Sequence, residues 1–135
     1  MNAKTVLLGY LLTFVVFLAV DMLWLGVIAK NLYARYLADF LSDKINWTAA
    51  IVFYLLFVVG ILIFAVYPAI SKQSVQHALL MGALFGFFTY ATYDLTNLAT
   101  LKGWPVPLVI IDIAWGTLLS ATVAFCGFQL TKWIS

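Results

Sequence analysis

The chain has 135 residues, of which 66% are hydrophobic and only 9% are charged, and its formal net charge is +2. A soluble domain of this size needs a mostly polar surface, and about 25% of its residues are ordinarily charged. The composition therefore excludes a soluble globular domain, and so small a net charge gives no basis for a nucleic-acid partner. A single cysteine, Cys126, excludes an internal disulfide framework. An integral membrane protein remains.

Four apolar stretches are long enough for a transmembrane helix, which needs about 20 residues. They cover residues 5–28, 47–67, 75–100 and 107–131. Because each stretch is continuously apolar rather than alternating, the pattern predicts helices and not the strands of a barrel. We therefore expect an all-α fold, in which residues 1–135 form a single four-helix transmembrane domain.

The connections between the spans have recognisable signals. Pro68 is expected to end the second span, because proline cannot continue the hydrogen-bond ladder of a helix. Residues 102–107 predict a tight turn. The connection 30–46 has apolar residues at helical spacing, which favours a short amphipathic helix lying in the headgroup interface, with a simple extension of the first span as the alternative. These apolar residues are Leu32, Tyr33, Tyr36, Leu37, Phe40 and Leu41.

Positive charges do not orient the bundle in the membrane. Four spans place both termini on one side, here called the terminal face, and the first and third connections on the other, here called the loop face. The terminal face holds three basic side chains and the loop face holds four, namely Lys4, Lys72 and Lys132 against Lys30, Arg35, Lys44 and Lys102. The positive-inside rule needs a clear excess, so the orientation stays open.

Three acidic residues, Asp21, Asp94 and Asp112, lie inside the apolar spans. A charged aspartate at mid-membrane costs about 2.5–3.5 kcal/mol on insertion scales, so such residues usually face a protein interior and serve a function. Counted along the helices, all three lie roughly 8–10 Å below the loop face. The sequence thus predicts one acidic layer, although any one of them could instead reach headgroup water.

Helical periodicity places each acid on a stripe with aromatic or small residues. The stripes contain Tyr10, Phe14, Phe17, Asp21 and Trp24 in the first span, Gly82, Gly86, Tyr90, Tyr93, Asp94 and Asn97 in the third, and Asp112, Trp115, Gly116, Leu119 and Val123 in the fourth. If the stripes face one another, they enclose a pocket, while the second span closes the bundle. The predicted ligand-binding residues are Asp21, Trp24, Tyr90, Tyr93, Asp94, Asn97, Asp112 and Trp115.

No lysine or arginine lies within the spans to balance these acids. At least one carboxyl group is therefore expected to keep its proton, or a cation is expected to lie between them. Cation–π attraction for an organic cation is expected from four aromatic side chains, Trp24, Trp115, Tyr90 and Tyr93. The leading hypothesis is an intramembrane pocket for a proton, a small cation or a cationic or hydroxyl-headed amphiphile, used in transport or sensing.

Two other functions stay open. The first is a membrane enzyme acting on a lipid or isoprenoid, with one aspartate as general acid and another as base. The second is a non-catalytic assembly subunit, in which the acids, Asn97 and Thr96 or Thr100 form interhelical hydrogen bonds. No cofactor and no metal site is predicted, since the only histidine, His77, lies at the far end of its span. The expected partners are membrane lipids.

Small residues predict close packing of the third and fourth spans. Ala78, Gly82 and Gly86 recur every four residues, as do Gly116, Ser120 and Ala124, which lets two backbones approach. The same runs could equally mediate a homo-oligomer. The remaining aromatic residues near the span ends are assigned to an interfacial belt, namely Tyr33, Tyr36, Trp47, Tyr67, Trp104 and Trp133.

These motifs resemble a family of small bacterial membrane proteins known only as a domain of unknown function. The resemblance rests on the run Tyr93-Asp94-Leu95-Thr96-Asn97, on Trp104-Pro105, on Asp112 with Trp115-Gly116, and on Asp21, Trp24 and Gly26 in the first span. It covers essentially the whole chain. It implies four transmembrane helices and a bacterial inner membrane, and it implies no activity, substrate or catalytic residue.

Overall fold

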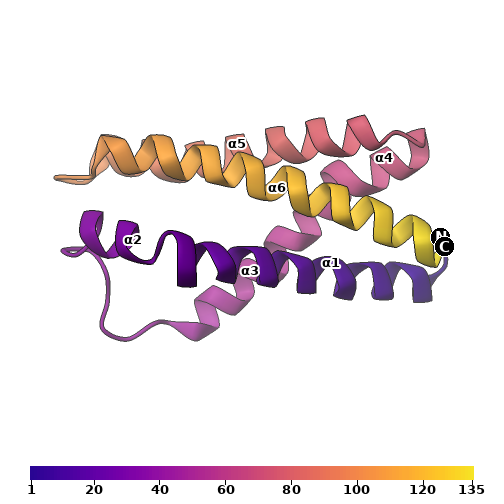
Figure 1. Ribbon diagram of the computed structural model, residues 1–135, viewed down its shortest axis with the longest axis horizontal. Helices are drawn as coiled ribbons and strands as arrows, with labels where there is room; N and C mark the ends of the chain where they lie inside the picture. Colours follow the sequence, from indigo (N-terminus) through magenta and orange to yellow (C-terminus); the bar gives the residue numbers. More distant parts are fainter.

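The structure is a computed structural model that describes residues 1–135, and it is helical throughout, without strands (Figure 1). In chain order its elements are α1 (Ala3–Leu23), the π-helical segment Trp24–Ile28, α2 (Lys30–Tyr36), α3 (Trp47–Ile61), the π-helical segment Leu62–Val66, α4 (Tyr67–Lys72), α5 (Val75–Thr100) and α6 (Val106–Ile134). Four continuous helical stretches are long and apolar enough to cross a membrane, namely Ala3–Ile28, Trp47–Lys72, Val75–Thr100 and Val106–Ile134. The all-α fold with four spans is confirmed.

The second span is longer than expected, and the prediction that Pro68 ends it is wrong. The chain stays helical to Lys72, with Pro68 in the first turn of α4. A π-helical segment directly precedes this turn. Proline is tolerated in the first turn of a helix, where its missing N–H has few partners to lose. The helix ends instead at Gln73, whose φ of 50° is left-handed.

The first connection is helical only in part. α2 ends at Tyr36, so the amphipathic helix covers seven residues and not the whole of 30–46. It is a separate element rather than an extension of the first span, because Ala29, with φ −110° and ψ 14°, breaks the helix before it. From Ser42 onward, hydrogen bonds between side chains and the backbone shape the connection. The Ser42 hydroxyl bonds the backbone of Lys44, and the Asn46 side chain caps α3 by accepting from the Ala49 N–H.

The helices pack as an antiparallel bundle with both termini at one end (Figure 1). α5 and α6 form the most extensive pair, and α1 packs against α6. The span containing α3 crosses these helices obliquely (Figure 1). Its backbone comes closest to α5 along the π-helical segment Leu62–Val66, whereas α3 meets α5 mainly through the Phe57 ring. The central core consists of Phe17, Phe57, Val58, Ile61, Leu62, Ala65, Val66, Leu119, Val123 and Ala124.

Glycines set the distance between α5 and α6, which confirms the predicted close packing. A Cβ atom on Gly86 would lie 2.1 Å from the Gly116 carbonyl oxygen, and one on Gly82 would lie 2.6 Å from the Ala124 side chain. Both runs of small residues therefore face each other within one chain. Gly116 in turn lies against the Tyr90 ring, 2.2 Å from where its own Cβ would be.

Candidate functional site

A cavity of about 450 Å³ lies at the end of the bundle opposite the termini. This volume falls within the range of about 300–1,000 Å³ that is typical of small-molecule sites. Every helix except α4 contributes to its wall. Thirteen of the 17 lining residues are hydrophobic, and the full lining is Asp21, Trp24, Leu25, Tyr33, Leu37, Ala50, Phe53, Tyr54, Phe57, Thr89, Tyr90, Tyr93, Asp94, Trp104, Leu108, Asp112 and Trp115.

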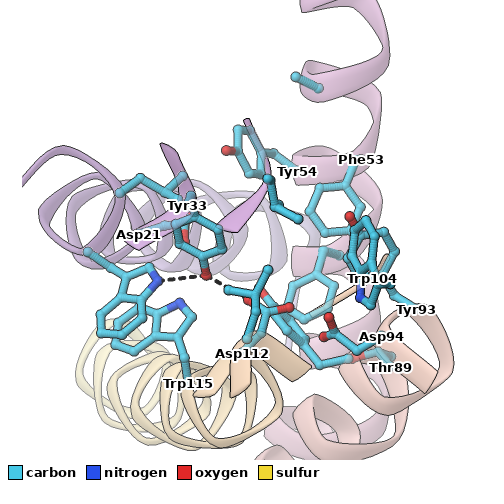
Figure 2. A pocket seen from close by; sticks show the side chains of 17 residues that line it. Asp21, Tyr33, Phe53, Tyr54, Thr89, Tyr93, Asp94, Trp104, Asp112 and Trp115 are labelled. Carbon is cyan, nitrogen blue, oxygen red and sulfur yellow. Dashed lines mark hydrogen bonds between the residues drawn. The ribbon is translucent and has the colours of Figure 1, made fainter. Parts of the chain in front are cut away.

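The structure brings the acidic residues of three apolar helices, Asp21, Asp94 and Asp112, to this cavity (Figure 2). Asp94 is fully buried, and neither of its carboxyl oxygens has a hydrogen-bond partner. It lies beside Asp112 (Figure 2), whereas Asp21 lies close to Tyr54 and Trp115. No lysine, arginine or histidine lines the cavity. Its acidic groups therefore have no counter-cation from the protein.

A chain of hydrogen bonds crosses one wall of the cavity. The Trp24 Nε1–H donates to the Tyr33 hydroxyl at 2.9 Å, and that hydroxyl donates to Asp112 Oδ1 at 2.6 Å (Figure 2). Trp24 also stacks on Trp115, with ring centroids 4.3 Å apart and an interplanar angle of 7°. The stack joins the first and fourth spans, and it places Trp115 near Asp21 of the first span. Trp24 belongs to a π-helical segment, a distortion that is frequent at functional sites.

Seven of the eight residues named from the sequence line the cavity, and Asn97 does not. Asn97 is half-buried, one turn beyond Asp94 towards the end of α5. Helical periodicity alone could not make this distinction, because it gives the angle around α5 but not the height at which the cavity ends. The binding role of these residues remains a prediction.

Tyr33 and Trp104, which are assigned to the interfacial belt from the sequence, also line the cavity. α2 lies at the end of the bundle opposite the termini (Figure 1), and Leu37, directly after it, packs with Trp104, Leu108 and Val109. The residues that sequence reasoning missed include these aromatic residues and two phenylalanines of α3, Phe53 and Phe57. The apolar face of α2 could have indicated this packing, because such a face needs another apolar surface to pack against. The oblique course of α3 has no comparable mark in the sequence.

The family described as predicted membrane protein (DUF2177) matches residues 6–129. The chain belongs to this family. No curated protein and no solved structure matches the chain. Family membership supports a membrane protein of unknown function. A molecular role for this DUF2177 member must therefore be inferred from the residues of the cavity.

The phenol of Tyr33 lies outside the membrane-spanning segments and is held in its neutral form. Burial raises its pKa well above the ordinary value, and its hydrogen bond to Asp112 and the charge of that carboxyl raise the pKa further. Tyr33 therefore remains a donor to Asp112 throughout the neutral and mildly alkaline range. This DUF2177 chain thus satisfies one of its acids with a group from α2.

Replacing Tyr33 with phenylalanine is expected to lower the thermal stability of the protein. The change leaves Asp112 Oδ1 and the Trp24 indole N–H without a partner, and an unsatisfied buried polar group costs about 1–3 kcal/mol. The melting temperature in non-ionic detergent measures the effect. Tyr36→Phe is the matched control on the same helix, since the Tyr36 hydroxyl makes no hydrogen bond, and an equal loss in both variants would contradict the account.

The difference in stability between the native protein and Tyr33→Phe is expected to shrink at alkaline pH. Because the pKa of Tyr33 is raised on folding, its contribution is fully present below about pH 10, the unperturbed value, and is lost as the pH rises through the folded value. Melting temperatures of both proteins between neutral pH and pH 11 test this. A difference that widens with pH would show that the sign is wrong.

The three carboxyl groups line one cavity without meeting at one point. No three acidic, histidine or cysteine side chains are close enough to share a metal ion. Asp94 lies beside Asp112 without a hydrogen bond between them, and the charge of Asp112 acts on Asp21 from another wall. The arrangement therefore offers acceptors along a surface, which suits an organic group with several donors better than a single compact ion.

Proposed function

We propose that this protein binds a small organic cation in its intramembrane cavity and serves in transport or sensing, in the inner membrane of a bacterial cell. The observation that carries the proposal is Asp94, which is fully buried in the cavity wall with both carboxyl oxygens unpartnered. A buried polar group without a partner costs about 1–3 kcal/mol, and more when charged. A bound cation with hydrogen-bond donors would offset this cost.

The other walls of the cavity are suited to the same ligand. Aromatic rings of Trp24, Tyr90, Tyr93, Trp104 and Trp115 surround the acids, and their faces attract a cation by about 0.5–2 kcal/mol each in favourable positions. Because the lining has three acidic residues and no basic residue, the electrostatic potential inside the cavity is negative. An anion would find no charged partner there, so the electrostatics select for positive charge.

The unpartnered acceptors narrow the chemistry of the cation. A carboxylate that lacks hydrogen bonds is satisfied by N–H donors, and hydrogen bonds to charged groups are worth about 1.5–3 kcal/mol. A quaternary ammonium supplies charge without donors, whereas a primary ammonium supplies both. We therefore expect a primary ammonium to bind more tightly than a quaternary one of similar size.

The hydrogen bonds around the acids support this role over the interhelical assembly role. Thr96 and Thr100 donate to carbonyl oxygens of their own helix, those of Thr92 and Thr96, and not across to a neighbouring helix. Asp94 makes no hydrogen bond to any helix. Asp112 accepts the Tyr33 hydroxyl, and Asp21 lies next to Tyr54 of α3 and Trp115 of α6. An acid kept for adhesion between helices would be expected to bond across the interface.

The proposal is tested by ligand-induced thermal shift of the purified protein in maltoside detergent, which has no charge of its own. Butylammonium, tetramethylammonium and butanol form the ligand series. We expect butylammonium to raise the melting temperature in a saturable way, tetramethylammonium to do so more weakly, and butanol to have no saturable effect.

Asp94→Asn is expected to remove the response to butylammonium, and Asp39→Asn, which changes an exposed acid outside the spans, is expected to preserve it. Equal responses to butanol and butylammonium, or a response that survives in Asp94→Asn, would contradict the proposal.

A further inference from the structure

The cavity has an opening on the side of the bundle, between α3 and α5. Two of its lining residues on these helices, Phe53 of α3 and Tyr93 of α5, are 48% and 53% exposed, so the lining reaches the surface of the bundle there. The backbones of α3 and α5 come close at few points. The side chains of the two helices meet deeper, where the Phe57 ring contacts Phe85 and Tyr90 at centroid distances of 5.2 and 6.2 Å and Gly60 lies against Phe85. Between that contact and the loop face, the two helices are farther apart.

The opening lies at the depth of the lipid chains and not at the membrane surface. Phe53 is six residues inside the span that begins at Trp47, and Tyr93 is seven residues before the span end at Thr100. At 1.5 Å per residue these positions are roughly 9 and 10 Å along their helices from the loop face. α2 lies at the end of the cavity nearest that face, and Leu37, directly after it, packs with Trp104 and Leu108. The lateral side is therefore the less obstructed way in.

We propose that the ligand is a single-chain amphiphile with a primary ammonium head, which enters laterally from the bilayer between α3 and α5. This inference rests on the proposed function and specifies its ligand class. The head reaches Asp94 and Asp112, and the hydrocarbon chain leaves between Phe53 and Tyr93 into the surrounding lipid. The chain then stays in an apolar environment throughout, so only the head exchanges its surroundings on binding.

The charges in the cavity exclude the commonest amine in a membrane, a phospholipid with an ethanolamine head. Its phosphate would enter a cavity that has three carboxyl groups and no lysine, arginine or histidine. Like charges at close range in a medium of low dielectric repel strongly. A free long-chain amine carries the same donors without the phosphate, and its net positive charge matches the site.

Photolabelling in phosphatidylcholine nanodiscs tests the inference directly. The probe is a primary alkylamine with a diazirine in the middle of its chain, and the control probe is the alcohol of the same chain. We expect the amine to label peptides of α3 and α5 around Phe53 and Tyr93. Labelling there is expected to fall by about tenfold or more in Asp94→Asn, a change equivalent to about 1.4 kcal/mol or more, and to stay unchanged in Asp39→Asn.

The outcomes separate this inference from the function on which it rests. If the amine labels all lipid-facing surfaces as the alcohol does, while butylammonium still stabilises the protein through Asp94, lateral entry is wrong and cation binding stands. If the amine labels no specific site and butylammonium gives no shift, both are wrong. A melting curve of Asp94→Asn in the same nanodiscs shows that the variant is folded.

Discussion

Replacing Asp94 with leucine is expected to stabilise the protein and at the same time to abolish ammonium binding. Leucine has nearly the shape of aspartate, and it removes two buried oxygens that have no partner in the fold. A buried polar group without a partner costs about 1–3 kcal/mol, and its removal relieves that cost. Loss of one member of a buried charge pair lowers affinity by about 2–5 kcal/mol. Melting temperature and ammonium-induced shift, measured on one preparation, report both effects.

The matched control is the same exchange at the neighbouring acid, Asp112→Leu, for which the opposite sign is expected. Asp112 accepts the Tyr33 hydroxyl, so its removal breaks the chain that continues to Trp24. That variant should lose about 1–3 kcal/mol of stability. If Asp94→Leu were as destabilising as Asp112→Leu, Asp94 would be a structural group and its lack of partners would have no functional meaning.

Replacing Gly86 with leucine is expected to cause the largest loss of stability of any change considered for this chain. Its Cβ would lie 2.1 Å from the Gly116 carbonyl oxygen, and backbone on both sides cannot yield without separating α5 from α6. Overpacking ordinarily costs about 1–3 kcal/mol, and a clash between two backbones belongs at or above the upper end. Because Asp94 and Asp112 lie on these two helices, separation should also abolish ligand binding.

Two other glycines give graded controls for this clash. A Cβ on Gly60 would meet only the tip of the Phe85 ring, at 2.5 Å, and one on Gly26 would have nothing within 4 Å. The expected order of melting temperatures is therefore Gly26→Leu near the native value, Gly60→Leu lower and Gly86→Leu lowest. If Gly26→Leu destabilised as much as Gly86→Leu, the loss would reflect a general effect of added side chains and not helix spacing.

The fold was largely predictable because its determinants are local and compositional. Apolar runs of more than 20 residues require transmembrane helices, and the small residues of two spans require close contact between them. The end of the second span was not predictable from Pro68, because whether a proline ends a helix depends on the hydrogen bonds of the turn before it. The π-helical segment Leu62–Val66 makes the turn before Pro68 irregular, and no sequence pattern predicts this segment.

The cavity was partly predictable for a related reason. Asp21, Asp94 and Asp112 stand out because ionisable residues are rare in apolar spans, and helix geometry then places their aromatic neighbours. Tyr33 and Trp104 were assigned to the membrane surface because both lie outside the apolar runs. What brings them into the site is the position of α2 and of the turn before α6 at the end of the bundle opposite the termini, and this depends on long-range packing with Leu108 and Val109.

The most direct test of the central claim, that Asp94 holds an ammonium group inside the bundle, is an X-ray structure with a bromine-labelled alkylamine bound. The account predicts a single anomalous bromine peak between α3 and α5, with the amine nitrogen within hydrogen-bond distance of the Asp94 carboxyl. An empty cavity at saturating amine, or a cavity closed by direct hydrogen bonds from neighbouring side chains to Asp94, would contradict it.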